Sequence, residues 1–320
     1  MNKKDLTIGQ HYVPQVYLRN FCTDKSDRKP KVWEYDKTTN NFTLKKVSSI
    51  CTCNFFYDLK KQDVQEFGKT VNDDKFINFD KPILDMSQPI ENFFANFVEG
   101  DLFNNIKEIL DVYEQYKDDD EKMKTLFISD EQLYLCSLYM NYQWMRTPRS
   151  KQILDNMDAN ANKKILEILD SYIGDQKDTE NLRDEIKVKS TQLYRKKMLH
   201  DIIMDKKHMM GMANIFYHMY KWVFAYSKES KFITSDYPAI VDQHYNFSGM
   251  PLAFPLSPEL CLLLISEDDD KNYERFKEGS FIKVPNKFVH SVNDSTLKNA
   301  DRFVICSINK ENDINKTILN

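Results

Sequence analysis

Glycine is scarce in this chain, with only 7 among 320 residues. A loop that cradles phosphate groups needs several glycines, because the backbone itself must approach the phosphate. Neither G-x-G-x-x-G nor G-x-x-x-x-G-K-[ST] occurs in the sequence. The sequence therefore argues against nucleotide enzymes of the Walker and Rossmann types, and we expect no nicotinamide, flavin or haem cofactor.

Long apolar runs are also missing. The best candidate, residues 259–265, has the length of a strand, whereas a membrane span needs about 20 apolar residues. The first residues, 1–5, lead into no apolar run that resembles a signal peptide. We therefore expect a soluble, cytoplasmic protein without a membrane partner.

Neither charge nor cysteine points to one class of partner. The 45 basic and 49 acidic residues give a net charge of -4, so no global positive field attracts nucleic acid, although a local basic groove is compatible with this balance. The six cysteines are expected to be free thiols in a reducing cytoplasm. Cys51 and Cys53 lie close together in the sequence, but no second pair or nearby histidine completes a zinc site.

Apolar and aromatic residues are abundant, at 41% and 13% of the chain. That composition excludes a disordered protein, and the length is sufficient for a substantial core. Alternating residues predict a β-hairpin from strands at 31–36 and 42–47. From about residue 90 the apolar period becomes helical. Ser129 and Gln132 form a capping-box pattern ahead of a buried helix over 133–145.

Further helices are expected over 150–174 and 180–226, the second bent near Gly211. After residue 227 the pattern returns to strands, with a short helix near 293–301. We predict an α+β fold in which the N- and C-terminal β segments form a mixed or antiparallel sheet around a central helical block. The expected organisation is one domain, 1–320, that is β-rich over 1–60, helical over 90–226 and β-rich over 230–310.

His11 is the first candidate for chemistry. An imidazole exchanges a proton near neutral pH, so His11 is a candidate general base or metal ligand. Its apolar neighbours favour equally a core histidine bonded to backbone.

Two arginines flank a Thr-Pro pair at the end of the buried helix. A guanidinium group binds phosphate or carboxylate through paired hydrogen bonds. The alternative is that Arg146 and Arg149 satisfy the last helix carbonyls, where positive charge is favoured. The alternative is stronger for Arg149, whereas Arg146 lies within the hydrophobic helix and is the better candidate to face a ligand or carboxylate.

Asp236 follows a predicted strand and precedes Tyr237 and Pro238. A carboxylate there suits a metal ligand or an acid–base group, because loops at sheet ends carry function. The alternative is a turn in which the side chain binds backbone amides. Asp242 and His244 share one side of an extended segment and could join Asp236 around a divalent ion, but a polar loop explains them more simply.

With these residues in hand, the chain resembles the family known as domain of unknown function 4238. The resemblance rests on a set of motifs that follow one another along nearly the whole chain: His11-Tyr12-Val13-Pro14 with Tyr17-Leu18 and Phe21, Gln143-Trp144-Met145-Arg146-Thr147-Pro148, Phe232-Ile233-Thr234-Ser235-Asp236-Tyr237-Pro238, Phe254-Pro255-Leu256-Ser257-Pro258, Asn293, and Arg302-Phe303-Val304-Ile305. The resemblance implies a single fold unit and assigns no activity.

These residues together favour a metal-assisted phosphodiesterase or nuclease-like hydrolase. In this hypothesis His11 and Asp236 are catalytic, Asp236 also binds a divalent cation (Mg²⁺ or Mn²⁺), and Arg146 with Tyr12 and Tyr17 binds the phosphate or substrate. The expected partner is nucleic acid or a nucleotide at a local basic site. The alternative is a non-catalytic module that binds a nucleotide, peptide or protein, with Arg146 in a pocket lined by aromatic residues.

Overall fold

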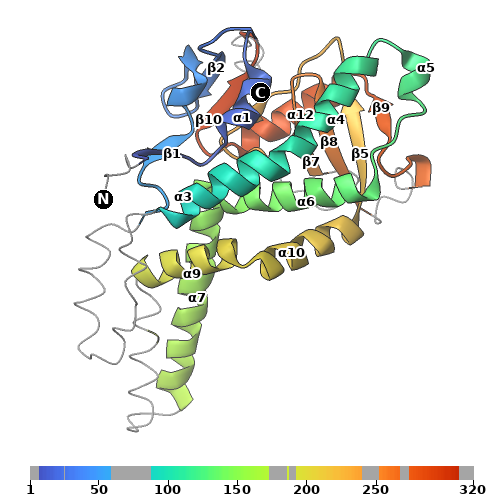
Figure 1. The fold of residues 1–320 in the computed structure, drawn as a ribbon. Coiled ribbons are helices and arrows are strands. Elements are labelled where there is room, and N and C mark those ends of the chain that lie inside the picture. Colours follow the sequence, from blue (N-terminus) through green and yellow to red (C-terminus); the bar gives the residue numbers. More distant parts are fainter. Residues whose placement is uncertain are drawn as a thin grey trace, which may run out of the picture. The chain divides into compact units, whose positions relative to one another are not determined.

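The computed structural model describes residues 7–24, 26–58, 88–172, 186, 192–239, 252–266 and 274–309 (Figure 1). Their contacts divide the chain into two compact units. The first unit draws on residues 1–10, 53–94 and 148–206, and the second on residues 11–52, 95–147 and 207–320. Short strands β1 (Gly9–His11) and β4 (Thr52–Asn54) lie where the chain passes from one unit to the other.

The second unit contains the predicted sheet between the two ends of the chain. Strands β2 (Lys31–Asp36) and β3 (Asn41–Lys46) form the expected hairpin. β10 (Phe303–Cys306) pairs antiparallel with β2 and with β6 (Thr234–Ser235), giving the order β3-β2-β10-β6. The α+β prediction, with N- and C-terminal strands in one sheet, is therefore confirmed.

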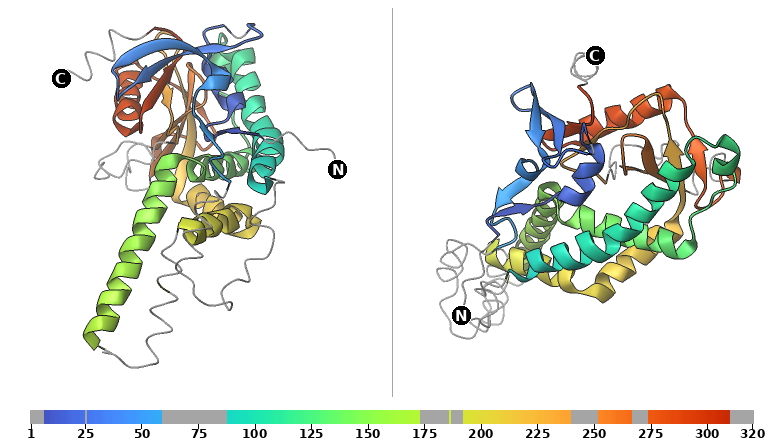
Figure 2. Two further views of the ribbon diagram at one scale, coloured as in Figure 1. Left: turned by 90° about the vertical axis from the view of Figure 1, so that its left-hand side faces the viewer. Right: turned by 45° about the horizontal axis from the view of Figure 1, so that its top comes forward.

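The two faces of this sheet are covered by different segments. Helix α12 (Asn286–Asn299) places Leu297 against Tyr35 and Val304 on one face, and Figure 2 shows the helix beside these strands. The α12 helix begins at residue 286, earlier than the short helix predicted near 293. On the other face lies the N-terminal segment with α1 (Gln15–Leu18) and the 3₁₀ turn η1 (Arg19–Phe21), where the Tyr17 hydroxyl bonds to the Thr234 hydroxyl at 2.7 Å.

A second sheet, β7-β8-β5-β9, also belongs to this unit. It consists of β7 (Leu252–Pro255), β8 (Leu260–Ser266), β5 (Tyr220–Tyr226) and β9 (Phe281–Lys283). The prediction of helix up to residue 226 is wrong for residues 220–226, which form β5. Their aromatic and β-branched side chains suit a strand, and β5 is buried between β8 and β9.

The helical part of the second unit surrounds one buried helix. Helix α6 (Asp130–Met145) begins with the predicted capping box, since Ser129 accepts from the Gln132 amide and Gln132 reaches back. Ahead of it lie the π-helix η5 (Phe94–Leu102), α4 (Phe103–Tyr116) and α5 (Asp120–Met123). Helix α10 (Lys206–Met219) leads into β5.

The described part of the first unit is mainly helical. Its elements are α3 (Pro89–Phe93), α7 (Pro148–Tyr172), which Figure 2 shows as one long helix, and α9 (Gln192–Met204). The break between α9 and α10 falls at Asp205 and not at Gly211, which lies inside α10 with open space around its Cα. Among the described residues, no helix combines the length and apolar composition needed to cross a membrane.

Candidate functional site

Arg146 lies at the end of α6 and is buried, with 1% of the residue exposed. One terminal nitrogen, Nη2, donates to the His11 carbonyl oxygen at 2.5 Å and to the Glu99 carboxylate at 3.0 Å. The helix ends here because the residues that follow, Thr147 and Pro148, do not continue it. Arg146 therefore holds together two segments that are far apart in sequence.

The His11 side chain is half-buried within the second unit. Burial lowers the pKa of His11, and the positive charge of Arg146 lowers it further, whereas the Glu99 carboxylate and a backbone hydrogen bond at Ser48 act in the opposite direction. With its pKa lowered, the imidazole is neutral at pH 7 and able to accept a proton.

Glu99 is the carboxylate that the sequence did not single out. It lies on the π-helix η5, and its side chain is 22% exposed. Wide helical turns of this kind are frequent at functional sites because they re-aim side chains that a regular helix would place elsewhere. No short motif surrounds Glu99 in the sequence, so only the fold brings it to His11.

Two further polar side chains extend the site along α6. Tyr139 and Gln143 are one turn apart and fully buried, and Gln143 Nε2 donates to the Tyr12 carbonyl at 3.2 Å. Within the described part of the chain, the Tyr139 hydroxyl and Gln143 Oε1 have no hydrogen-bond partner. Burial raises the pKa of Tyr139. The positive charge of Arg146 lowers this pKa, and the negative charge of Glu99 raises it. Such buried polar atoms carry a desolvation cost unless a further group binds them.

These five residues are here named the Arg146 cluster: His11, Glu99, Tyr139, Gln143 and Arg146. Three of them stand at spacings of four and three along α6, so they lie on one side of that helix. That spacing is the feature of the sequence that could have identified Tyr139 and Gln143 as neighbours of Arg146. The cluster combines a proton acceptor, a carboxylate, a guanidinium and two uncharged polar groups, which is a set suited to acid–base chemistry on a polar substrate.

The structure places Asp236 in different surroundings, at the end of β6. Its Oδ1 accepts from the Asp301 amide at 2.9 Å, and its Oδ2 accepts from the amides of Arg302 and Phe303 at 2.7 and 2.9 Å. Only 3% of the residue is exposed. Burial raises the pKa of Asp236 to about 6, while the three amides oppose this shift. Asp236 therefore anchors the start of β10, and no hydrogen bond joins it to His11 or Arg146 among the described contacts.

Tyr12 and Tyr17 are both buried. The Tyr17 hydroxyl donates to the Pro255 carbonyl at 2.6 Å, and its ring stacks on Phe254 with centroids 5.4 Å apart. Burial raises the pKa of Tyr12, as do the Cys51 thiol that its hydroxyl contacts and the charge of Asp236. The two tyrosines fix the N-terminal segment on the sheet.

A metal-ligand set does not emerge among the residues that the structure describes, since no group of three or more His, Cys, Asp or Glu side chains could hold an ion there. Both oxygens of Asp236 bind backbone amides. Asp242 and His244 lie outside the described residues. Arg149 belongs to the first unit, at the start of α7. Binding of a divalent cation remains a prediction.

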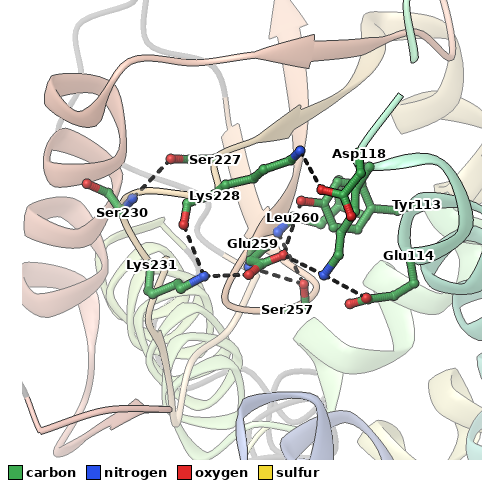
Figure 3. Close-up of polar contacts among 11 residues, drawn as sticks. Tyr113, Glu114, Asp118, Ser227, Lys228, Ser230, Lys231, Ser257, Glu259 and Leu260 are labelled. Carbon is green, nitrogen blue, oxygen red and sulfur yellow. Dashed lines mark hydrogen bonds and ion pairs between the residues drawn. The ribbon is translucent and has the colours of Figure 1, made fainter. Parts of the chain in front are cut away.

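A second group of charged side chains surrounds Glu259 at the start of β8 (Figure 3). Lys231 and Lys117 both pair with Glu259, and the Tyr113 hydroxyl donates to the same carboxylate at 3.3 Å. Lys117 also pairs with Glu114 at 2.8 Å, and Lys228 pairs with Asp118 at 2.8 Å. Each lysine is thus matched by a carboxylate. This network joins the end of α4 to the strand ends and offers no surplus charge to a ligand.

Comparison with known proteins identifies one family. The model of the family described as "Protein of unknown function (DUF4238)" matches residues 9–310, and the chain therefore belongs to this family. The match confirms the resemblance read from the motifs. No curated protein and no solved structure matches the chain.

Proposed function

We propose that this member of the DUF4238 family is a hydrolase whose general base is His11. The observation that carries the proposal is the pair of hydrogen bonds from Arg146 Nη2 to the His11 carbonyl and the Glu99 carboxylate. These bonds hold an imidazole of lowered pKa close to a carboxylate. In this proposal His11 takes a proton from the water that attacks the substrate, and Glu99 stabilises the imidazolium that forms. The imidazolium then gives the proton to the leaving oxygen as its bond to the attacked atom breaks.

A phosphodiester is the proposed substrate class. The Tyr139 hydroxyl is a donor suited to the anionic oxygens of such a substrate, and Gln143 supplies a polar contact beside it. Arg146 acts in this proposal as a positioning residue, because its contacts are to His11 and Glu99. Asp236 is left out of the chemical step, since its carboxylate binds three backbone amides.

The test is hydrolysis of bis-p-nitrophenyl phosphate and of labelled oligonucleotides, with added Mn²⁺ and with a chelator in parallel. The His11→Asn variant should lose about 10²- to 10⁴-fold in rate, which is the contribution of a positioned general base. The backbone carbonyl that binds Arg146 is unchanged in this variant, so its melting temperature should stay close to that of the wild type. His208→Asn, at an exposed position on α10, is the matched control and should retain full activity.

A second variant examines the carboxylate. Glu99 raises the pKa of His11, so Glu99→Gln should move the ascending limb of the pH–rate profile to lower pH. The proposal fails if neither Mn²⁺ nor chelator conditions give hydrolysis, or if His11→Asn remains as active as the wild type. Loss of activity in the chelator alone would support the predicted divalent cation.

The alternative proposal is a module that binds a nucleotide, peptide or protein without turnover. The observation in its favour is the burial of Arg146, whose guanidinium is engaged inside the protein. Binding of a mononucleotide in isothermal titration calorimetry, without hydrolysis of any substrate above and with loss of binding in Gln143→Leu, would favour this alternative.

A further inference from the structure

We propose that one face of the β2–β3 hairpin binds single-stranded nucleic acid. This face, here named the Trp33 face, consists of Lys31 and Trp33 on β2 and of Phe42, Leu44 and Lys46 on β3. It belongs to the second unit and shares no residue with the Arg146 cluster. The inference concerns binding, and it does not depend on the proposed hydrolysis.

The register of the hairpin brings these side chains together. Lys31 is directly opposite Lys46, and Trp33 is directly opposite Leu44. Because side chains alternate along a strand, residues two apart lie on the same face, so both pairs and Phe42 share one surface. Among the strands that the structure describes, β3 stands at the edge of its sheet.

An anion bound at the two lysines would relieve the repulsion between their positive charges. Like charges directly opposite each other on neighbouring strands destabilise the pair. Within the described part of the chain, neither Lys31 nor Lys46 forms an ion pair. Other lysines of the hairpin are satisfied: Lys45 pairs with Glu34 at 2.6 Å, and Lys37 donates to the Ala300 carbonyl at 2.6 Å.

The loop that leads into β2 carries charges of both signs. Arg28 and Lys29 are exposed in the loop that leads into β2. The acidic residues of that loop bind within it, since Asp24 accepts from the Ser26 amide and Asp27 accepts from the Lys29 amide, both at 2.8 Å. Arg28 and Lys29 thus balance Asp24 and Asp27 in this loop, so the local positive charge is that of the Lys31–Lys46 pair itself, in a chain whose net charge is -4.

Aromatic and apolar side chains lie next to the lysines. The rings of Trp33 and Phe42 are stacked, with centroids 5.5 Å apart and planes at 20°. Both residues are half-buried, because they pack against the buried cluster that contains Tyr35, Leu297 and Val304. Leu44 is 44% exposed, and Ile308, just beyond β10, is 49% exposed. Aromatic rings beside cationic groups are the combination that binds unpaired bases and their phosphates. A duplex covers the faces of its bases by stacking, so the single strand is the form that fits.

The test is fluorescence anisotropy with 5′-fluorescein-labelled dT12, carried out in the His11→Asn protein with chelator present, so that hydrolysis plays no part. Binding should weaken as salt rises, because phosphate contacts release counterions. In Lys31→Ala/Lys46→Ala, the slope of log K against log salt should fall in magnitude by about 1.4, at about 0.7 for each lost contact to a single strand. Lys206→Ala/Lys207→Ala, two exposed lysines at the start of α10, is the charge-matched control and should leave the slope unchanged.

Aromatic stacking is tested separately with Trp33→Leu. Removal of the ring should weaken dT12 binding about 5- to 100-fold at constant salt, while Trp33→Phe should recover much of the loss. Circular dichroism melting of each variant shows that it is folded. The inference is overturned if dT12 does not bind, if the two lysine doubles behave alike, or if poly-glutamate or duplex DNA binds as tightly as dT12. If the wild type hydrolyses a substrate while the binding test gives such a result, the binding inference is refuted and the proposed hydrolysis is not.

Discussion

The contact between Asp236 and the backbone amides at the start of β10 provides a quantitative test of the structure. The carboxylate accepts three backbone amides from residues 301–303. Burial nevertheless raises the pKa of Asp236 from 3.8 to about 6 in the folded protein. Asp236→Asn keeps the size of the side chain and removes its titration, so the variant isolates this one group.

The direction of the pH effect follows from proton binding. Between pH 3.8 and about 6 the folded protein binds the Asp236 proton more tightly than the unfolded chain does. The stabilisation is therefore complete below the unfolded pKa, and it is lost as the pH rises through the folded pKa. A shift of about two pKa units corresponds to about 3 kcal/mol at about 1.4 kcal/mol per unit. The wild type should thus gain about 3 kcal/mol relative to Asp236→Asn as the pH falls from 7 to below 4.

The measurement is urea unfolding of both proteins at intervals between about pH 3 and pH 8, followed by the difference in the free energy of unfolding at each pH. All other titrating groups are common to both proteins and cancel in this difference. If the wild type instead loses stability relative to the variant as the pH falls, the three amides outweigh burial and the reasoning is refuted. Asp236→Ala supplies the structural comparison, with an expected loss of about 2–4 kcal/mol at pH 7 from amides left without their acceptor.

Three other substitutions test the packing of the second unit, each by urea unfolding. Tyr17→Phe should lose about 1–3 kcal/mol, because the hydroxyl donates to the Pro255 carbonyl at 2.6 Å in a buried position; an unchanged midpoint would contradict this contact. Gly279→Ala should lose more than about 1 kcal/mol, since Gly279 has a φ of +69° and an added Cβ would lie 2.3 Å from the Ile128 carbonyl oxygen; Ser280→Ala next to it is the control. Asp36→Asn should show the opposite pH trend to Asp236, because Arg302, whose Nη2 lies 2.8 Å from the Asp36 carboxylate, lowers the pKa of Asp36. The wild-type advantage is therefore lost as the pH falls; a pH-independent difference would argue against this ion pair.

Local features of the chain were readable from the sequence. The β2–β3 hairpin follows from alternating side chains around a polar turn, and the start of α6 follows from Ser129 and Gln132. Each of these signals involves residues a few positions apart. Residues 220–226 show the limit of such local patterns, since a run of large apolar side chains fits a helix or a strand, and the pairing of β5 with β8 and β9 decides between them.

The amino-acid sequence by itself determined the family and the α+β class, through motifs that include those around His11, Arg146 and Asp236. Only the tertiary structure decided what these residues contact. Asp236 meets amides 65 to 67 residues further along the chain, and Arg146 meets a carboxylate on a π-helix 47 residues before it. The physical reason is that a buried charged group must be paired or hydrogen-bonded, and its partners are the groups that the packing of helices and strands places next to it. The spacing of residues in the sequence does not identify those partners.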